Sequence, residues 1–212
     1  MRTASSPTLS SPLDAPLHDF VTDLRIVPAQ TRLAFSTRSV IGTVHGVFTD
    51  VRGVVRLNEA DPRYTHVDVR VPVASIVTHS TVRDARFLGP EFFDAVAYPA
   101  ICFYGRWLRG DPLREFALDG ELRVRDVGRE ITLDVRTIDR TVDGAGATEH
   151  ARYRATTVID RRDFRLVARH RLDLGPLALG YTIRITLEVT LARQRRASAP
   201  TNAHDTLRRW SR

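Results

Sequence analysis

The chain has 212 residues, 42% of them hydrophobic and 27% charged, which predicts one domain with a substantial core. All 32 basic residues are arginine, and residues 192–212 hold six of them against one aspartate, a net +5 of the formal +7, whereas residues 1–23 carry −2. The charge lies mainly in the C-terminal segment, which argues against a basic nucleic-acid-binding face on the domain.

Both ends of the chain are expected to be disordered tails. Residues 1–22 are rich in serine and proline, and residues 192–212 are rich in arginine without apolar periodicity. Residues 23–191 are therefore the expected folded domain.

Short strands follow one another through this domain. Apolar and polar residues alternate with a period of two, most clearly where Ile183, Ile185 and Leu187 share one face. Glycine, proline and aspartate supply turns between the strands, as at 110–112 and 143–146. The expected strands lie at 24–27, 33–37, 51–57, 65–76, 100–108, 116–124, 131–135, 153–159 and 183–191. This pattern predicts an all-β fold, an antiparallel barrel of about eight strands, because closure removes unpaired edges.

The segment near 81–95 is the single expected helical region. It brings Phe87, Leu88, Phe92 and Phe93 together within seven residues, which supplies a surface to bury and few groups that do chemistry. We therefore interpret it as an aromatic plug at one end of the barrel. Asp84 is interpreted as the cap of this helix, with general base as the alternative, and Asp94 as a cap or turn residue.

Catalytic and metal-binding patterns are absent from the sequence. The seven histidines show no i, i+2 or i, i+4 spacing, although His45 and His79 lie nearest the expected barrel mouth. A nucleophile elbow, a glycine-rich phosphate loop and a Cys-x-x-Cys pair are also missing. We therefore expect no catalytic residue, no metal and no cofactor, and a metal site built from distant strands is kept as the alternative.

The compartment is predicted from cysteine use and hydropathy. Cys102 is the only cysteine, so no intramolecular disulfide can form, and we expect a passive side chain there. Residues 1–20 contain no apolar run typical of a signal peptide, and no window is apolar over the ~20 residues that span a membrane. We expect a soluble, cytoplasmic protein.

Several sequence pieces in order resemble the YceI-like family, the polyisoprenoid-binding, lipocalin-like proteins. The most specific block contains Arg83-Asp84, Phe92-Phe93-Asp94 and Tyr98-Pro99. The matching pieces are residues 24–38, 44–57, 67–103, 118–135, 155–166 and 179–189. The resemblance implies a barrel with a long apolar tunnel that holds an isoprenoid-type lipid, such as a polyprenyl quinone precursor. It also implies carriage or sequestration of that lipid without transformation, and a homodimer.

The inward positions are the expected lining of that tunnel. The resemblance favours a cavity over the alternative that these side chains simply fill a core. The expected ligand-binding residues are Phe35, Phe48, Val71, Phe87, Phe92, Phe93, Ile101, Phe103, Trp107, Leu122, Leu133, Tyr153, Ile183, Ile185 and Leu187. Arg152 and Arg165 stand where the family often has glycine, and we expect them near one loop, where they narrow or recharge the barrel mouth.

Two other classes of function are kept as alternatives. One is an enzyme that acts on a barrel-bound lipid, with Asp84 or a mouth histidine as its acid–base group. The other is a surface-binding module whose segment Arg193–Arg212, with Trp210, docks on an anionic membrane or on nucleic acid. A basic domain face is not indicated, so we expect no nucleic acid as partner. The tail lacks apolar periodicity, so we expect at most a transient membrane contact that aids lipid uptake.

Overall fold

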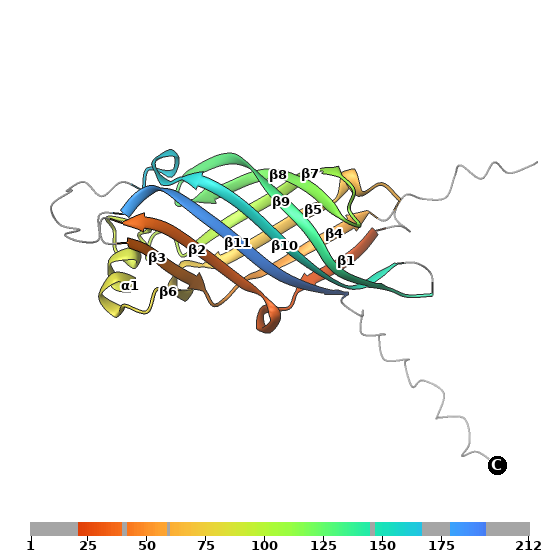
Figure 1. The fold of residues 1–212 in the computed structure, drawn as a ribbon, viewed down its shortest axis with the longest axis horizontal. Coiled ribbons are helices and arrows are strands. Elements are labelled where there is room, and N and C mark those ends of the chain that lie inside the picture. Colours follow the sequence, from red (N-terminus) through yellow and green to blue (C-terminus); the bar gives the residue numbers. More distant parts are fainter. Residues whose placement is uncertain (1–20, 40–41, 59, 145–146, 167–178, 194–212) are drawn as a thin grey trace, which may run out of the picture.

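A computed structural model of the protein describes residues 21–39, 42–58, 60–144, 147–166 and 179–193. The described chain forms an elongated antiparallel barrel, with α1 (Thr81–Leu88) at one end and the start of β1 (Val21–Ile26) at the other (Figure 1). The remaining strands are β2 (Arg32–Ser39), β3 (Gly42–Phe48), β4 (Arg52–Asn58), β5 (His66–Pro72), β6 (Ile76–Val77), β7 (Ala100–Gly110), β8 (Glu115–Val124), β9 (Val127–Val142), β10 (Thr148–Asp160) and β11 (Leu179–Arg193). Short 3₁₀ turns are η2 (Pro28–Gln30), η3 (Pro62–Tyr64), η4 (Val73–Ser75) and η5 (Arg161–Phe164).

Three of the long strands of the barrel are each interrupted once. β1 and β2 both pair with β11, β4 and β3 pair with them in turn, and β5 and β6 pair with β4 and β3. The strands β1 and β2 therefore act as one long strand broken by a short turn or 3₁₀ segment, and so do β3 and β4, and β5 and β6. This gives eight long strands. β11 closes the ring onto β1 in the register Leu24 with Arg193 and Ile26 with Leu191. This closed barrel is the predicted fold.

The bounds of several strands differ from the prediction. β1 begins at Val21 and β11 ends at Arg193, so the sheet extends two residues beyond each end of the expected domain at 23–191. The rest of the two expected tails lies outside the described residues. β3 was missed, because one of its inward positions is Gly46, where a Cβ would lie 2.3 Å from Cζ of Phe35. The ring of Phe35 takes the place that an apolar side chain of β3 would otherwise fill.

The helix at 81–95 forms where expected but is shorter. Ser80 caps α1, since its hydroxyl accepts from the N–H of Arg83 at 3.4 Å. Asp84 is not the cap: its carboxylate accepts from the N–H and the hydroxyl of Thr78, at 3.0 and 2.5 Å, and so fastens the helix to the end of β6. Asp94 is a turn residue with a φ of 51°.

Candidate ligand-binding cavity

The barrel encloses a cavity of about 240 Å³. An apolar cavity of about 150 Å³ is enough to hold a benzene-sized molecule. Its wall takes residues from every long strand of the described barrel and from the aromatic segment after α1, and the lining is almost entirely apolar. The interior of this barrel therefore contains space that its own side chains do not fill.

Inward residues along β9 and β11 show the same incomplete filling. Leu133, Ile183, Ile185 and Leu187 line the cavity and yet are only half-buried. Leu24, which packs in the dense part of the core, is 0% exposed. A close-packed interior leaves few voids larger than a water molecule. The contrast separates a packed core from a wall that faces open space.

Fourteen of the fifteen predicted residues line this cavity. They come from eight strands and the α1 segment, which the barrel brings together from distant parts of the chain. These residues are Phe35, Phe48, Val71, Phe87, Phe92, Phe93, Ile101, Phe103, Leu122, Leu133, Tyr153, Ile183, Ile185 and Leu187.

Trp107 is the exception, and its predicted inward position is wrong. Its side chain is 62% exposed on the outer face of β7. The pairing of β7 with β8 shifts between Gly105 and Trp107, so a β-bulge reverses the alternation after Gly105. A bulge adds one residue to one strand and turns later side chains to the opposite face. Leu108 therefore points inward in place of Trp107 and lines the cavity.

The aromatic plug at the α1 end is a connected cluster of rings. Phe92 lies with its ring centroid 4.9 Å from that of Phe87 and 4.8 Å from that of Phe93, the second pair edge to face. Phe93 contacts Phe48 at 6.3 Å, and Phe48 contacts Phe35 at 5.7 Å. Such pairs contribute about 0.5–1.5 kcal/mol each beyond burial of their area. The cluster joins the segment after α1 to β2 and β3 and forms one end wall of the cavity.

Four polar side chains of the lining, Thr37, Thr65, Thr157 and Arg161, were not singled out in the sequence, and Arg161 and Thr65 are described here. Arg161 follows Tyr153, Ala155, Thr157 and Ile159 at the same two-residue spacing, so the inward face of β10 continues to it. That spacing was the available signal. Its side chain is 5% exposed, and burial lowers the pKa of its guanidinium below the ordinary value.

The second of these polar residues is Thr65, between η3 and β5. It is 3% exposed, and its hydroxyl has no hydrogen-bond partner among the described residues. Arg161 lies beside the start of β11, whereas Thr65 lies beside the end of β4, which pairs with the start of β1. The two polar positions therefore lie toward opposite ends of the cavity.

The profile of the YceI-like domain matches residues 24–191, well over half of the chain. The chain belongs to the YceI-like family. It is 26% identical to protein YceI of Escherichia coli over 145 residues, which cover 68% of this chain and 73% of that protein.

Solved structures agree with this YceI-like assignment. BcnA of Burkholderia cenocepacia superposes with a TM-score of 0.66 at 16% identity, over 78% of this chain and 98% of BcnA. The polyisoprenoid binding domain from Saccharophagus degradans superposes with a TM-score of 0.61 at 13% identity, over 81% and 98% of the two chains. At these identities, the likeness establishes the barrel fold of the YceI-like chain and nothing further.

The two arginines at family glycine positions lie apart in this YceI-like barrel. Arg165 follows η5 and has a left-handed φ of 55°, a conformation that glycine adopts more readily. Arg152 lies within β10, opposite Thr190 and Asp139, and is exposed. The expectation that both stand at one loop is therefore wrong, because Arg152 lies within a strand and away from η5.

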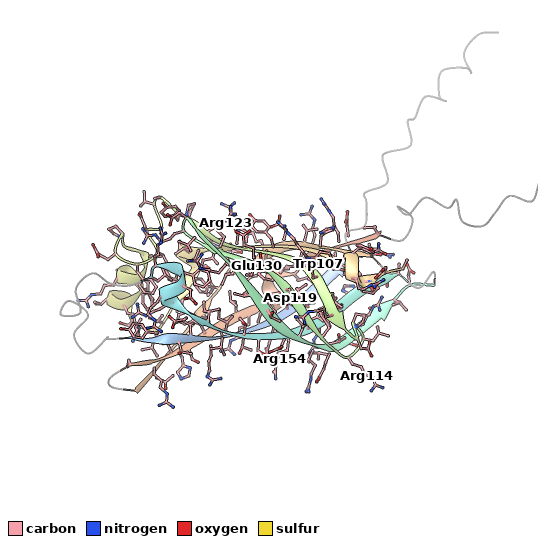
Figure 2. The ribbon with its side chains drawn as sticks, turned by 90° about the horizontal axis from the view of Figure 1, so that it is seen from above. Trp107, Arg114, Asp119, Arg123, Glu130 and Arg154 are labelled. Carbon is pink, nitrogen blue, oxygen red and sulfur yellow. The ribbon has the colours of Figure 1, made fainter. Side chains whose placement is uncertain are left out.

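The outer surface of the YceI-like barrel is charged. Figure 2 marks Trp107, Arg114, Asp119, Arg123, Glu130 and Arg154, which belong to β7–β10 and the turn before β8. Asp119 accepts from Arg109 at 2.7 and 2.9 Å and from the hydroxyl of Thr132 at 2.6 Å. These bonds, the one from Arg109 first, lower the pKa of Asp119 below its ordinary value. Most ion pairs on this outer surface are solvated, and such pairs contribute little to stability.

The sequence candidates for chemistry do not converge in the YceI-like barrel. His45 and His79 are exposed, and neither lines the cavity. Among the residues that the structure describes, no three His, Cys, Asp or Glu side chains are placed to hold a metal ion. Cys102 is half-buried, and its hydrogen bond raises the pKa of Tyr104. None of the described helices has the length and apolar character required to span a membrane.

Proposed function

We propose that this protein binds a long apolar lipid of the isoprenoid type in its barrel and carries or sequesters it. The apolar cavity of about 240 Å³ is the observation that carries the proposal. Membership of the YceI-like family, together with structural likeness to a polyisoprenoid binding domain, supports the isoprenoid class. Burial of apolar ligand surface contributes about 25 cal/mol per Å², so a prenyl chain needs no charged partner along its length.

We infer binding without turnover. The described residues that line the cavity include no histidine, aspartate or glutamate, the usual groups for acid–base catalysis. The carboxylate of Asp84, the candidate base, accepts hydrogen bonds from the N–H and the hydroxyl of Thr78, and Asp84 does not line the cavity. An enzyme acting on the bound lipid would have only Tyr153 and Cys102 as acid–base side chains among the described residues of the lining.

Three further features belong to the same proposal. A homodimer is proposed from family membership, and transient membrane contact is proposed for Arg193–Arg212 from its run of arginines. The cytoplasm is the proposed compartment, because a lone cysteine needs no oxidising surroundings. Sedimentation, vesicle flotation at rising salt and cell fractionation test these features in turn.

The direct test begins with organic extraction and mass spectrometry of the protein purified from its own source. An intact isoprenoid lipid is expected in the extract. The second step uses delipidated protein and a fluorescent prenyl analogue. Ile185→Trp places an indole in the cavity, and Arg184→Trp places the same group on the exposed outer face as a matched control.

Ile185→Trp should abolish binding of the analogue with little change in melting temperature, because the indole occupies ligand volume. Overpacking a filled core would instead cost ~1–3 kcal/mol. Arg184→Trp should bind as the wild type does. A wild type that binds no apolar ligand, or an Ile185→Trp variant that is severely destabilised yet binds normally, contradicts the proposal.

A further inference from the structure

Arg161 is the one charged side chain among the described residues that line the cavity. Its guanidinium donates from Nε to the carbonyl of Gly180 at 3.0 Å and from Nη2 to the carbonyl of Leu179 at 3.0 Å. Nη1 donates to the carbonyl of Leu166. A guanidinium carries five N–H donors. Three are used, so two N–H groups are left for another acceptor.

The positive charge of Arg161 is not neutralised within the described structure. No ion pair joins it to a described carboxylate, and its partners are neutral carbonyls and the face of Tyr181, 5.1 Å from its Cζ. The neighbouring Arg162 differs, since its guanidinium binds Asp160 at 2.6 Å and is 56% exposed. A buried charge without an opposite partner is strongly unfavourable, and a group that neutralises it gains correspondingly.

We propose that Arg161 anchors the head group of the bound lipid, and that this head carries an anionic oxygen such as that of a phosphate or carboxylate. The inference rests on the proposed function, because it assigns the polar end of the same ligand. Arginine pairs with carboxylate and phosphate oxygens through short charge-assisted bonds, which are roughly twice as strong as neutral ones. An anion at this position supplies the negative charge that balances the guanidinium of Arg161.

The remainder of the cavity fixes the direction of the lipid. The other described residues of the wall are apolar except for the neutral Thr37, Cys102, Tyr153 and Thr157, and the Thr65 hydroxyl carries no charge that would balance an anion. The head therefore lies at the η5 end, and the apolar chain runs along the barrel toward η3. A lipid held in the opposite direction would leave the charge of Arg161 uncompensated.

The test compares three ligands with one apolar chain and different ends: farnesyl phosphate, farnesol and farnesene. Binding to delipidated wild-type protein is measured by displacement of a fluorescent prenyl analogue. Farnesyl phosphate should bind at least about tenfold more tightly than farnesene, as expected for a hydrogen bond to a charged group. Arg161→Met should lose this preference and keep its affinity for farnesene. Arg161→Lys, which keeps the charge, should retain part of the preference.

Arg162→Met is the matched control. It removes a guanidinium that lies over the same Tyr181 ring, but Arg162 does not line the cavity. It should preserve the preference for phosphate. Equal binding of all three ligands by the wild type overturns the role of Arg161 and leaves lipid binding intact, whereas binding of none overturns lipid binding itself.

Loss of carbonyl bonds in Arg161→Met can prevent folding. In that case the Nε–H resonance of Arg161 in the ¹⁵N-labelled wild type decides. It should shift with farnesyl phosphate and not with farnesene, and equal shifts with both ligands overturn the proposal.

Discussion

Arg165 shows how one residue can carry local strain without disturbing the fold. Its φ of 55° lies in the left-handed region, and its N–H donates to the carbonyls of Arg161 and Arg162 at the end of η5. Residues with a Cβ meet their own backbone in this conformation, at a cost of roughly 1–2 kcal/mol. The position is one that glycine suits better.

Arg165→Gly should therefore raise the free energy of unfolding by about 1 kcal/mol, the strain relieved less the larger backbone entropy of glycine. Urea unfolding measures the change. Arg165→Ala is the control, since it removes the same side chain and keeps the Cβ. A gain in the alanine variant equal to that in the glycine variant would show that the side chain, and not the backbone, is responsible.

Asp119 should contribute a pH-dependent part of stability. Arg109 and Thr132 lower the pKa of its carboxyl in the folded protein below the unfolded value of about 3.9. A lowered pKa stabilises the fold above the unfolded pKa, and this contribution is lost as pH falls through the folded pKa. Asp119→Asn should thus be less stable than the wild type at pH 6, and the difference should shrink below about pH 4. A difference that stays constant from pH 6 to pH 2 would exclude this origin.

Individual side chains mark what could be predicted from the sequence. The alternation at Ile183, Ile185 and Leu187 was sufficient to place all three inward, because strand geometry alone decides it. Trp107 was misplaced because a bulge leaves no clear mark in composition. The cavity itself follows from how far facing walls stand apart, a distance between strands that no local pattern records.

At the scale of elements, the last two residues of β11 hold the end of this strand in place. Arg193 pairs with Leu24, and its guanidinium bonds Asp143 and lies 3.4 Å from the hydroxyl of Thr22. Arg25 pairs with Ala192. These contacts tie the end of β11 to β1 and to the turn after β9.

A chain that ends at Leu191 should therefore melt at a lower temperature than one that ends at Arg193. The shorter chain loses the backbone pairs at Arg193 and Ala192 and the ion pair with Asp143. Hydrogen bonds of this kind contribute about 0.5–1.5 kcal/mol each. Scanning calorimetry of the two truncated proteins makes the comparison, with the full chain as reference. Equal melting temperatures would show that these contacts contribute nothing measurable.

At the scale of the whole molecule, the cavity should couple ligand to stability. A ligand that binds only the folded protein stabilises it by about 2.7 kcal/mol at a hundredfold excess over Kd. The delipidated protein should therefore melt at a lower temperature than the loaded protein, and Ile185→Trp should abolish the difference between them. A shift of equal size in Ile185→Trp would place the ligand outside the cavity.

Circular dichroism gives a second check on the whole molecule. The described strands outweigh the one helix of 8 residues, so the spectrum should be that of a β protein. A helical content above about a third, the average of globular domains, would contradict the fold.

The order of synthesis determines when the barrel can close. β11 pairs with β1 and β2, which are made first, and with β10, so the wall has a gap until the last strand has left the ribosome. Contacts between residues far apart in the chain form late and slow folding. A nascent chain thus has no closed cavity before β11 emerges, so a ligand of the kind proposed above can be enclosed only after this strand has been made.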